Sequence, residues 1–263
     1  MNCLFWNVNK LKINDYLLDL IVENGLQLLI LAEYKDNWKD LIRELGKMKI
    51  IFYHHHKIGC ERIDIFSIFP PSQIKDLNEE WHYTIKEISH STLGTINLAC
   101  VHFQSKMHSN DLDQLQEASH LIKDILDVED TTNENTIIVG DFNMNPFSMG
   151  ILSSSGIHSY PTKFEARKIS RTISKRDYKM FYNPMWKFMG NSSDPLGTYY
   201  YSSSHSYQLY WNVFDQIIYR PGLIEYIPDE NIKILTKTNK NKFVNRNGKP
   251  NISDHLPLYF EII

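Results

Sequence analysis

Apolar and polar residues form blocks in the first part of the chain, and these blocks predict a strand–helix–strand unit. Residues 3–6 (CLFW) make a short apolar run that is typical of a buried strand. Residues 13–24 carry apolar side chains at helical spacing, with Asn14 as a possible cap and Gly25 at the expected stop. A second apolar run covers residues 26–33. The carboxyl ends of the two strands should therefore point the same way.

Two more helices are predicted, over 38–47 and over 111–127, where Leu112, Ala118 and Ile125 share one apolar stripe. Strand-like segments recur over 49–53, 63–69, 81–88, 92–103, 137–140, 197–201, 207–219, 232–236 and 257–262. Residues 148–195 show no clean period, and residues 236–250 indicate a polar hairpin or loop. Because no linker or repeat divides the chain, we expect a single domain over residues 1–263.

Several predicted strands end in polar residues that are capable of chemistry. They are Asn7 after CLFW, Glu33 after LLILA, His102 after INLACV, Asp141 and Asn143 after TIIVG, Asp215 within NVFDQIIY, and Asp254 and His255 before the last strand. Taken singly, each is compatible with a turn, an exposed strand end or a hydrogen-bonded core histidine. Gathered at one rim, the carboxylates would repel one another unless a cation lay among them. Oxygen donors without cysteine favour Mg²⁺ or Mn²⁺ over Zn²⁺, and such a set suits hydrolysis of a phosphate ester.

Six motifs, in this order, resemble those of the endonuclease/exonuclease/phosphatase superfamily. They are FWNVN, LLILAEYK, VHFQS, VGDFNMNP, FDQIIY and SDHLPL, and they span the chain from Asn7 to His255. The resemblance implies a four-layer α/β sandwich, with two packed, mainly antiparallel β-sheets flanked by helices. It also implies a metal-dependent phosphoric ester hydrolase. A nuclease acting on DNA or RNA is the leading expectation, and a phosphodiesterase or phosphatase for a small molecule or lipid headgroup is the alternative. A non-catalytic binding protein is disfavoured because the essential acidic and histidine positions are all present.

Carried over position by position, the resemblance implies a metal site built from three residues. Glu33 would be the principal ligand, Asn7 would lie beside it, and Asp254 would complete the metal environment. Many members carry an acidic residue two positions after the first Asn, where this chain has Asn9. That difference removes one potential ligand and leaves open whether one or two metals act. Mg²⁺ is the expected ion, with Mn²⁺ as a substitute.

The same resemblance implies roles in the chemical step. Asp141 would orient or deprotonate the attacking water, and Asn143 would position that water and the phosphate. His255, with Asp215 as its carboxylate partner, would stabilise the charge that develops on the phosphate. His102 would contact a phosphate oxygen on the leaving-group side.

The basic stretch 163–179 is the segment from which we expect substrate contacts, because it falls between the fourth and fifth motifs. Arg171, Lys175 and Arg176 are its leading candidates, although a solvated face would have the same composition. Nearby aromatic residues would either stack on bases or form loop core. Gln216 stands where the inositol-phosphatase branch has Arg, which argues against inositol phosphates.

Composition and local sequence limit the substrate-binding surface, the metal-binding candidates and the cellular location that we expect. The net charge of −3 excludes a globally basic surface, so nucleic acid must be bound by a local patch. Cys3, Cys60 and Cys100 have neither zinc nor disulfide spacing, and Cys3 and Cys100, which lie in strand-like runs, are expected to be buried free thiols. His residues 54–56 are not expected to form a metal site, because neighbours on a strand point to opposite faces.

No signal peptide is visible, and the longest apolar run (28–32) is too short to span a membrane. We therefore expect a cytoplasmic protein without membrane contact.

Overall fold

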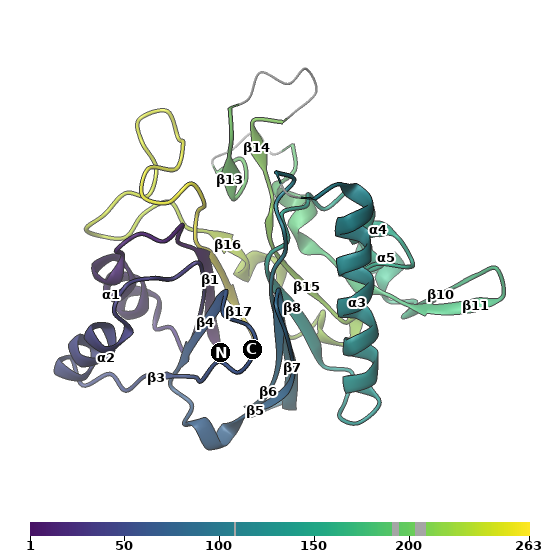
Figure 1. The fold of residues 1–263 in the computed structure, drawn as a ribbon, viewed down its shortest axis with the longest axis horizontal. Helices are drawn as coiled ribbons and strands as arrows, with labels where there is room; N and C mark the ends of the chain where they lie inside the picture. Colours follow the sequence, from purple (N-terminus) through teal and green to yellow (C-terminus); the bar gives the residue numbers. More distant parts are fainter. Residues whose placement is uncertain (108, 191–194, 203–208) are drawn as a thin grey trace.

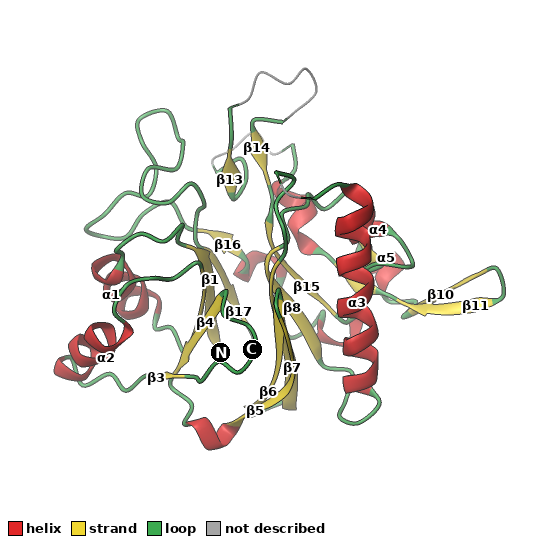
Figure 2. Cartoon of the chain, in the orientation of Figure 1, coloured by secondary structure: helices red, strands yellow, loops and turns green. Residues whose placement is uncertain are grey.

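Two large β-sheets face each other in the computed structural model, which describes residues 1–107, 109–190, 195–202 and 209–263. Helices α1 (Asn14–Asn24) and α2 (Trp38–Lys47) lie outside one sheet (Figure 1). Outside the other sheet lie α3 (Asp111–Glu129), α4 (Met149–Leu152) and α5 (Lys163–Ala166) (Figure 2). The predicted four-layer sandwich is confirmed. Within the described ranges, none of the helices combines the length and apolar character that a membrane crossing requires.

The first sheet has the strand order β16-β17-β1-β2-β4-β3. Its strands are β16 (Lys233–Ile234), β17 (Leu258–Glu261), β1 (Asn2–Asn7), β2 (Leu28–Ala32), β4 (Ile63–Ser67) and β3 (Tyr53–His54). The pairing of β1 with β2 is parallel, whereas the other pairings are antiparallel. Because Asn7 pairs with Ala32, the ends of β1 and β2 bring Asn7 and the next residue, Glu33, to one edge of the sheet.

The second sheet has the order β5-β6-β7-β8-β15-β12-β9. Its strands are β5 (Ile74–Glu80), β6 (Tyr83–His90), β7 (Gly94–His102), β8 (Thr136–Asp141), β15 (Asp215–Tyr219), β12 (Phe181–Tyr182) and β9 (Ser159–Tyr160). β7 and β8 are parallel, with His102 opposite Asp141, and β15 runs antiparallel to β8, with Asp215 opposite Asp141. Three of the predicted site residues, His102, Asp141 and Asp215, therefore lie side by side at one end of the sheet. This end of the second sheet and the facing ends of β1 and β2 are together called the catalytic rim.

Two small ribbons and several 3₁₀ turns complete the chain. The ribbons pair β10 (Ser170–Ile173) with β11 (Arg176–Lys179) and β13 (Tyr199–Tyr200) with β14 (Trp211–Asn212). The 3₁₀ turns are η1 (Pro71–Gln73), η2 (Pro184–Phe188), η3 (Pro221–Leu223) and η4 (Asp229–Asn231).

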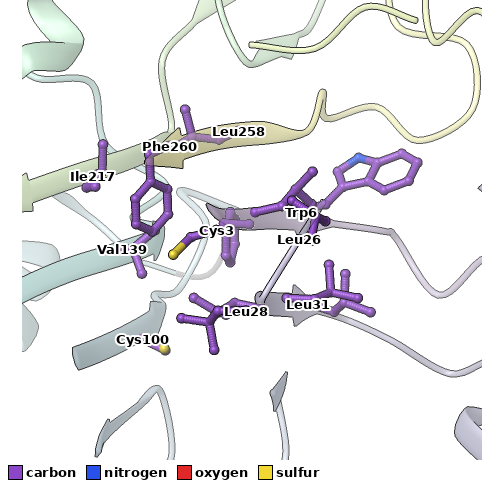
Figure 3. Packing of buried hydrophobic residues seen from close by; sticks show 14 of the residues in the cluster. Cys3, Trp6, Leu26, Leu28, Leu31, Cys100, Val139, Ile217, Leu258 and Phe260 are labelled. Atoms are coloured by element: carbon purple, nitrogen blue, oxygen red, sulfur yellow. The ribbon is translucent and has the colours of Figure 1, made fainter. Parts of the chain in front are cut away.

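Apolar side chains fill the space between the two sheets. Cys3 and Phe260 of the first sheet lie near Val139 and Ile217 of the second, and all are fully buried members of one cluster (Figure 3). Burying a Phe side chain contributes about 1.5–3 kcal/mol, so this layer holds the two halves of the rim in a fixed relation. The three cysteines are buried and free, which confirms the prediction for Cys3 and Cys100. Burial raises the pKa of the Cys3 thiol far above its usual range, which makes it unreactive.

The structure corrects several details of the sequence analysis. The strand β5 was not predicted, because its polar residues suit a solvent-facing edge strand rather than a buried one. In α3 the predicted stripe residues Ala118 and Ile125 are buried, whereas Leu112 is 67% exposed. The buried face also includes Gln114, Leu121 and Val128, which were not predicted. Gly25 closes α1 with φ of 55°, as predicted. The predicted strand 207–219 splits into β14 and β15, and its residues 207–208 lie outside the described residues.

The three consecutive histidines also separate as predicted. His54 Nε2 lies 2.8 Å from Asp64 Oδ1, whereas His55 is buried and its Nε2 lies 2.7 Å from Ser67 Oγ. His56 is exposed. The run does not converge on one point, although only His56 is truly a surface residue.

Candidate active site

Asp141, at the end of β8, lies at the centre of the catalytic rim and is buried. Asn7 Nδ2 donates a hydrogen bond to Asp141 Oδ2 at 2.9 Å, and the backbone N–H of Asn143 donates to Oδ1 at 2.9 Å. The Nε2 atoms of His102 and His255 lie 3.9 Å and 3.8 Å from Oδ2. Residues from three distant segments, Asn7, His102 and His255, thus meet around one carboxylate, as the strand ends predicted.

His255 is held by Asp215 beneath the rim, and both residues are buried. His255 Nδ1 lies 2.8 Å from Asp215 Oδ2, and Trp6 Nε1 donates to the His255 carbonyl oxygen at 2.9 Å. Burial alone would lower the pKa of His255, but the charges of Asp215 and Asp141 outweigh it and raise this pKa to about 10. Burial raises the pKa of Asp215 to about 6 despite the attraction of His255. Near neutral pH the pair is therefore an imidazolium and a carboxylate, with Nε2–H directed to the rim.

His102 faces Asp141 from the side opposite His255, and its pKa is shifted in the opposite direction. Burial lowers the pKa of His102, and the nearby carboxylates of Asp141 and Glu33 only partly offset this effect. Its Nε2 lies 3.6 Å from Glu33 Oε1, and among the described residues its buried Nδ1 has no hydrogen-bond partner. The rim therefore holds one neutral histidine and one cationic histidine on either side of Asp141.

Backbone conformations at the rim are unusual in three places. Glu33 and Asn143 have φ of 56° and 50°, in the left-handed region that side chains other than Gly rarely adopt. Gly140 has φ of 152°, and a Cβ there would lie 2.0 Å from the carbonyl oxygen of Val101. At Glu33 and Asn143 such conformations cost about 1–3 kcal/mol each and persist where surrounding structure enforces them, as at functional sites. Glycine adopts a positive φ without this cost.

Asn143 is fixed by its own contacts. Its Nδ2 donates to the carbonyl oxygen of Phe103 at 2.9 Å, and its carbonyl oxygen accepts from Gln114 Nε2 at 3.0 Å. The loops that follow β7 and β8 are therefore tied together directly behind Asp141. The role of Asn143 in positioning water and phosphate stays a prediction, and its side-chain oxygen, which takes no part in these two contacts, is the atom available for it.

The donor atoms at the rim suit a divalent cation. One polar atom each of Asp141, Asp215 and His255 lies within 4.8 Å of the others. Because the protonated His255 has no lone pair for a metal, the carboxylate oxygens are the donors that this cluster offers at neutral pH. The predicted ligands Asn7 and Glu33 lie at the same rim, and the Glu33 side chain is 25% exposed, with Lys10 Nζ 3.4 Å from its Oε2. Carboxylate and carboxamide oxygens are the donors that hard cations prefer.

Asp254 differs from the other predicted ligands. It is exposed and accepts a 3.3 Å hydrogen bond from Ser253 Oγ, and it adjoins His255 in the chain. No contact with Asp141 or Glu33 is seen among the described residues. Metal binding by Glu33, Asn7 and Asp254 stays a prediction.

The predicted substrate residues Arg171, Lys175 and Arg176 are not brought to the catalytic rim. They lie on or at the turn of the β10–β11 hairpin, which projects from the body of the molecule (Figure 1). The chain leaves this hairpin into β12, where Tyr182 pairs with Tyr219, at the end of β15 opposite Asp215. Contact between the hairpin and a long substrate stays a prediction, but its placement does not support contact near the scissile bond.

The aromatic residues that follow the hairpin are mostly core. Phe181 and Tyr182 are buried, and Lys163 Nζ lies 5.8 Å from the centre of the Tyr182 ring. Of the two interpretations of these aromatics, packing in the core is correct for Phe181 and Tyr182, although both lie in the strand β12 and not in a loop.

A different set of aromatic residues lies beside the rim and was missed. The Tyr199 ring lies 4.6 Å from the His255 ring and 5.2 Å from the Phe214 ring, measured between centroids. Tyr201 is nearly parallel to Tyr199, with an interplanar angle of 11° and centroids 6.4 Å apart. The available signal was the run TYYY at 198–201, which lies shortly before the fifth motif.

The comparisons with known proteins agree with this geometry. The model of the Endonuclease/Exonuclease/phosphatase family matches residues 4–255. The chain belongs to this family. No curated protein sequence matches it. The chain is thus a phosphoesterase of a family that is typically metal-dependent, with a buried Asp–Asp–His cluster as a candidate metal site.

Solved structures of this family show the same fold at low sequence identity. A Neisseria 3′ phosphatase, NExo, bound to a product DNA hairpin, has a TM-score of 0.60 at 14% identity, covering 100% of this chain and 99% of its own. An AP endonuclease from Archaeoglobus fulgidus has a TM-score of 0.55 at 16% identity, covering 100% and 99%. The human Nocturnin catalytic domain, with bound sulfate, has a TM-score of 0.55 at 13% identity, covering 99% and 93%.

Proposed function

We propose that this protein is a Mg²⁺-dependent phosphodiesterase that hydrolyses DNA or RNA. The observation that carries the proposal is the row of aromatic rings beside His255. Tyr199 lies against the His255 ring, and Tyr201, which is 46% exposed, continues the row outward. Stacking of a base on an aromatic side chain contributes about 1–3 kcal/mol and tolerates any base.

His255 supplies positive charge to the phosphate in this proposal. The Nδ1–H group of His255 donates a hydrogen bond to Asp215, so the Nε2–H group is left to donate to a phosphate oxygen as negative charge develops there. Trp6 fixes the backbone of His255, which keeps the ring in place.

Asp141 is placed to act on the water that attacks phosphorus. Asn7 and the backbone of Asn143 fix both of its oxygens, so the carboxylate holds one orientation while it accepts the water proton. Asp141, with Glu33 and Asn7 beside it at the rim, would hold Mg²⁺. When bound, this ion neutralises negative charge and lowers the pKa of a coordinated water.

Relatives and net charge favour different substrates. Solved relatives include structures bound to DNA, which supports a nucleic acid. The net charge of −3 instead suits a small phosphoester or a lipid headgroup, which needs no extended basic surface. We favour the nucleic acid because a small phosphoester would leave the outward part of the tyrosine row unused.

A substrate panel tests the proposal. The purified protein is incubated with Mg²⁺ or with EDTA against plasmid DNA, single-stranded DNA, single-stranded RNA and bis(p-nitrophenyl) phosphate. We expect cleavage of at least one nucleic acid with Mg²⁺, none with EDTA, and recovery when Mg²⁺ is restored. Cleavage of the small diester alone would favour the alternative substrate class, and cleavage in EDTA would contradict the metal requirement.

A further inference from the structure

We propose that the segment Lys237–Lys249, here called the basic loop, binds the phosphate backbone of the substrate beside the scissile bond. This inference rests on the proposed function, because it names how a nucleic acid strand would be held at the same site. The loop carries five basic residues, Lys237, Lys240, Lys242, Arg246 and Lys249, and no acidic residue. In a chain with a net charge of −3, such a cluster is a local exception.

The chain connects the basic loop directly to the catalytic rim. Six residues after the loop comes His255, and Figure 1 shows the loop in yellow at the same end of the molecule as β13. Phe243, in the middle of the loop, is buried and its ring lies 5.4 Å from the ring of Trp6. Because Trp6 Nε1 bonds to the His255 carbonyl oxygen, loop and catalytic histidine share one anchor.

The basic loop consists of two turns with different contacts. The first turn is pinned to α1, since the Asn239 N–H donates to the Glu23 carboxylate at 2.9 Å and Lys240 Nζ pairs with Asp19 at 2.8 Å. In the second turn, Asn245 Oδ1 accepts hydrogen bonds from its own turn, and Arg246 is exposed at the tip. The first turn fixes the loop and the second is presented to solvent.

Most of the charge in the basic loop is uncompensated. Lys237, Lys242 and Arg246 are exposed, and within the described ranges none forms an ion pair with a carboxylate. The Lys249 Nζ lies 4.3 Å from the centre of the Tyr200 ring. Like charges held together without partners repel, and a polyanion relieves that repulsion.

The basic loop and the tyrosine row therefore both lie against β13, on its two faces. Lys249 touches Tyr200, whereas the neighbouring ring of Tyr199 points to the other face and touches His255. A nucleic acid strand offers both features that the loop and the row complement, because its bases have flat faces and its phosphates carry negative charge. A small phosphodiester held at His255 would not extend to the exposed charges of the loop.

The test compares two triple variants of equal charge change. In the loop variant, Lys237, Lys242 and Arg246 are replaced by Ser. In the control, the exposed residues Lys49, Lys75 and Lys233, which lie outside the loop, are replaced by Ser. For each protein we measure kcat and KM at several salt concentrations on the nucleic acid that the wild type cleaves, turnover of bis(p-nitrophenyl) phosphate, and the melting temperature.

We expect the loop variant to raise KM for nucleic acid by about tenfold and to reduce the salt slope of log(kcat/KM) by about 2, because each lost phosphate contact removes about 0.7–0.9 from that slope. Its turnover of the small diester and its melting temperature should match those of the control. An unchanged KM and slope in the loop variant, or equal changes in the control, would overturn the proposal. A wild type that cleaves the small diester but no nucleic acid would instead overturn the proposed function, and this inference with it.

Discussion

Two segments of the molecule carry most of the clustered positive charge, and they lie in very different places. The β10–β11 hairpin holds Arg171, Lys175 and Arg176, and it leaves the body near Tyr219. The basic loop holds a similar number of charges but leads into His255. In composition the two segments are hard to tell apart. Strand direction distinguishes them, because β15 carries Asp215 at one end and Tyr219 at the other.

This comparison shows that position between motifs is a weak guide to position in space. The hairpin lies between the fourth and fifth motifs, and the basic loop between the fifth and the sixth. Both satisfy the expectation of a loop near the site. Only the basic loop is tied to a catalytic candidate, through Phe243, Trp6 and the backbone of His255.

The largest loss of activity is expected from a substitution at His255, six residues after the basic loop. His255→Ala removes the cation that faces the phosphate, and loss of such a group costs about 2.7–4 kcal/mol, or about 10²–10³ in kcat. The loss should be equal on nucleic acid and on the small diester, which separates chemistry from strand binding. His56→Ala, at an exposed histidine, is the matched control. Full activity in His255→Ala would refute the assigned role.

A smaller effect, with a distinct pH signature, is expected from Asp215→Asn. The pKa of His255 is raised to about 10, above its ordinary value of about 6.5, so the imidazolium is present at neutral pH and is lost as pH rises through about 10. Without the Asp215 charge this pKa falls, and the alkaline limb of the pH–kcat profile should move toward neutral pH.

The free energy of unfolding should also decrease as the pH rises. A raised pKa in the folded state stabilises that state fully below about 6.5, and the contribution disappears as pH rises through about 10. The free energy of unfolding of the wild type should therefore decline over that window more than that of Asp215→Asn. Superimposable pH profiles for the two proteins would contradict the ion pair.

The smallest effect is expected from shortening the hairpin. Replacing residues 173–176 by Asn-Gly removes Lys175 and Arg176 and keeps a two-residue turn. Because the hairpin is exposed and remote from Asp215, kcat, KM and the salt slope should each stay within about twofold, as for ordinary surface changes. A large rise in KM here, with none in the loop variant, would reverse the comparison between the two segments.

The fold and the centre of the site were largely predictable from the sequence. Strand ends are marked by an abrupt change from apolar to polar residues, so Asn7, Glu33, His102 and Asp141 were recognisable as a group. Their convergence followed from the parallel pairing of β1 with β2 and of β7 with β8.

Other features depended on three-dimensional information that the sequence does not contain. The direction of the β10–β11 hairpin is set by the pairing of Tyr182 with Tyr219, which no local pattern encodes. The contact of Tyr199 with His255 joins residues that lie far apart in the chain. The strand β5 was missed because an edge strand with polar residues resembles a loop.

Gly140 has a consequence for the whole rim. The strands β7 and β8 approach so closely there that even one methyl group would collide with the Val101 carbonyl oxygen. Any side chain at this position would wedge the two strands apart immediately before His102 and Asp141, whose side chains extend from their final residues. The absence of a Cβ atom at Gly140 thus permits the close approach of β7 and β8 that sets the distance between the side chains of His102 and Asp141.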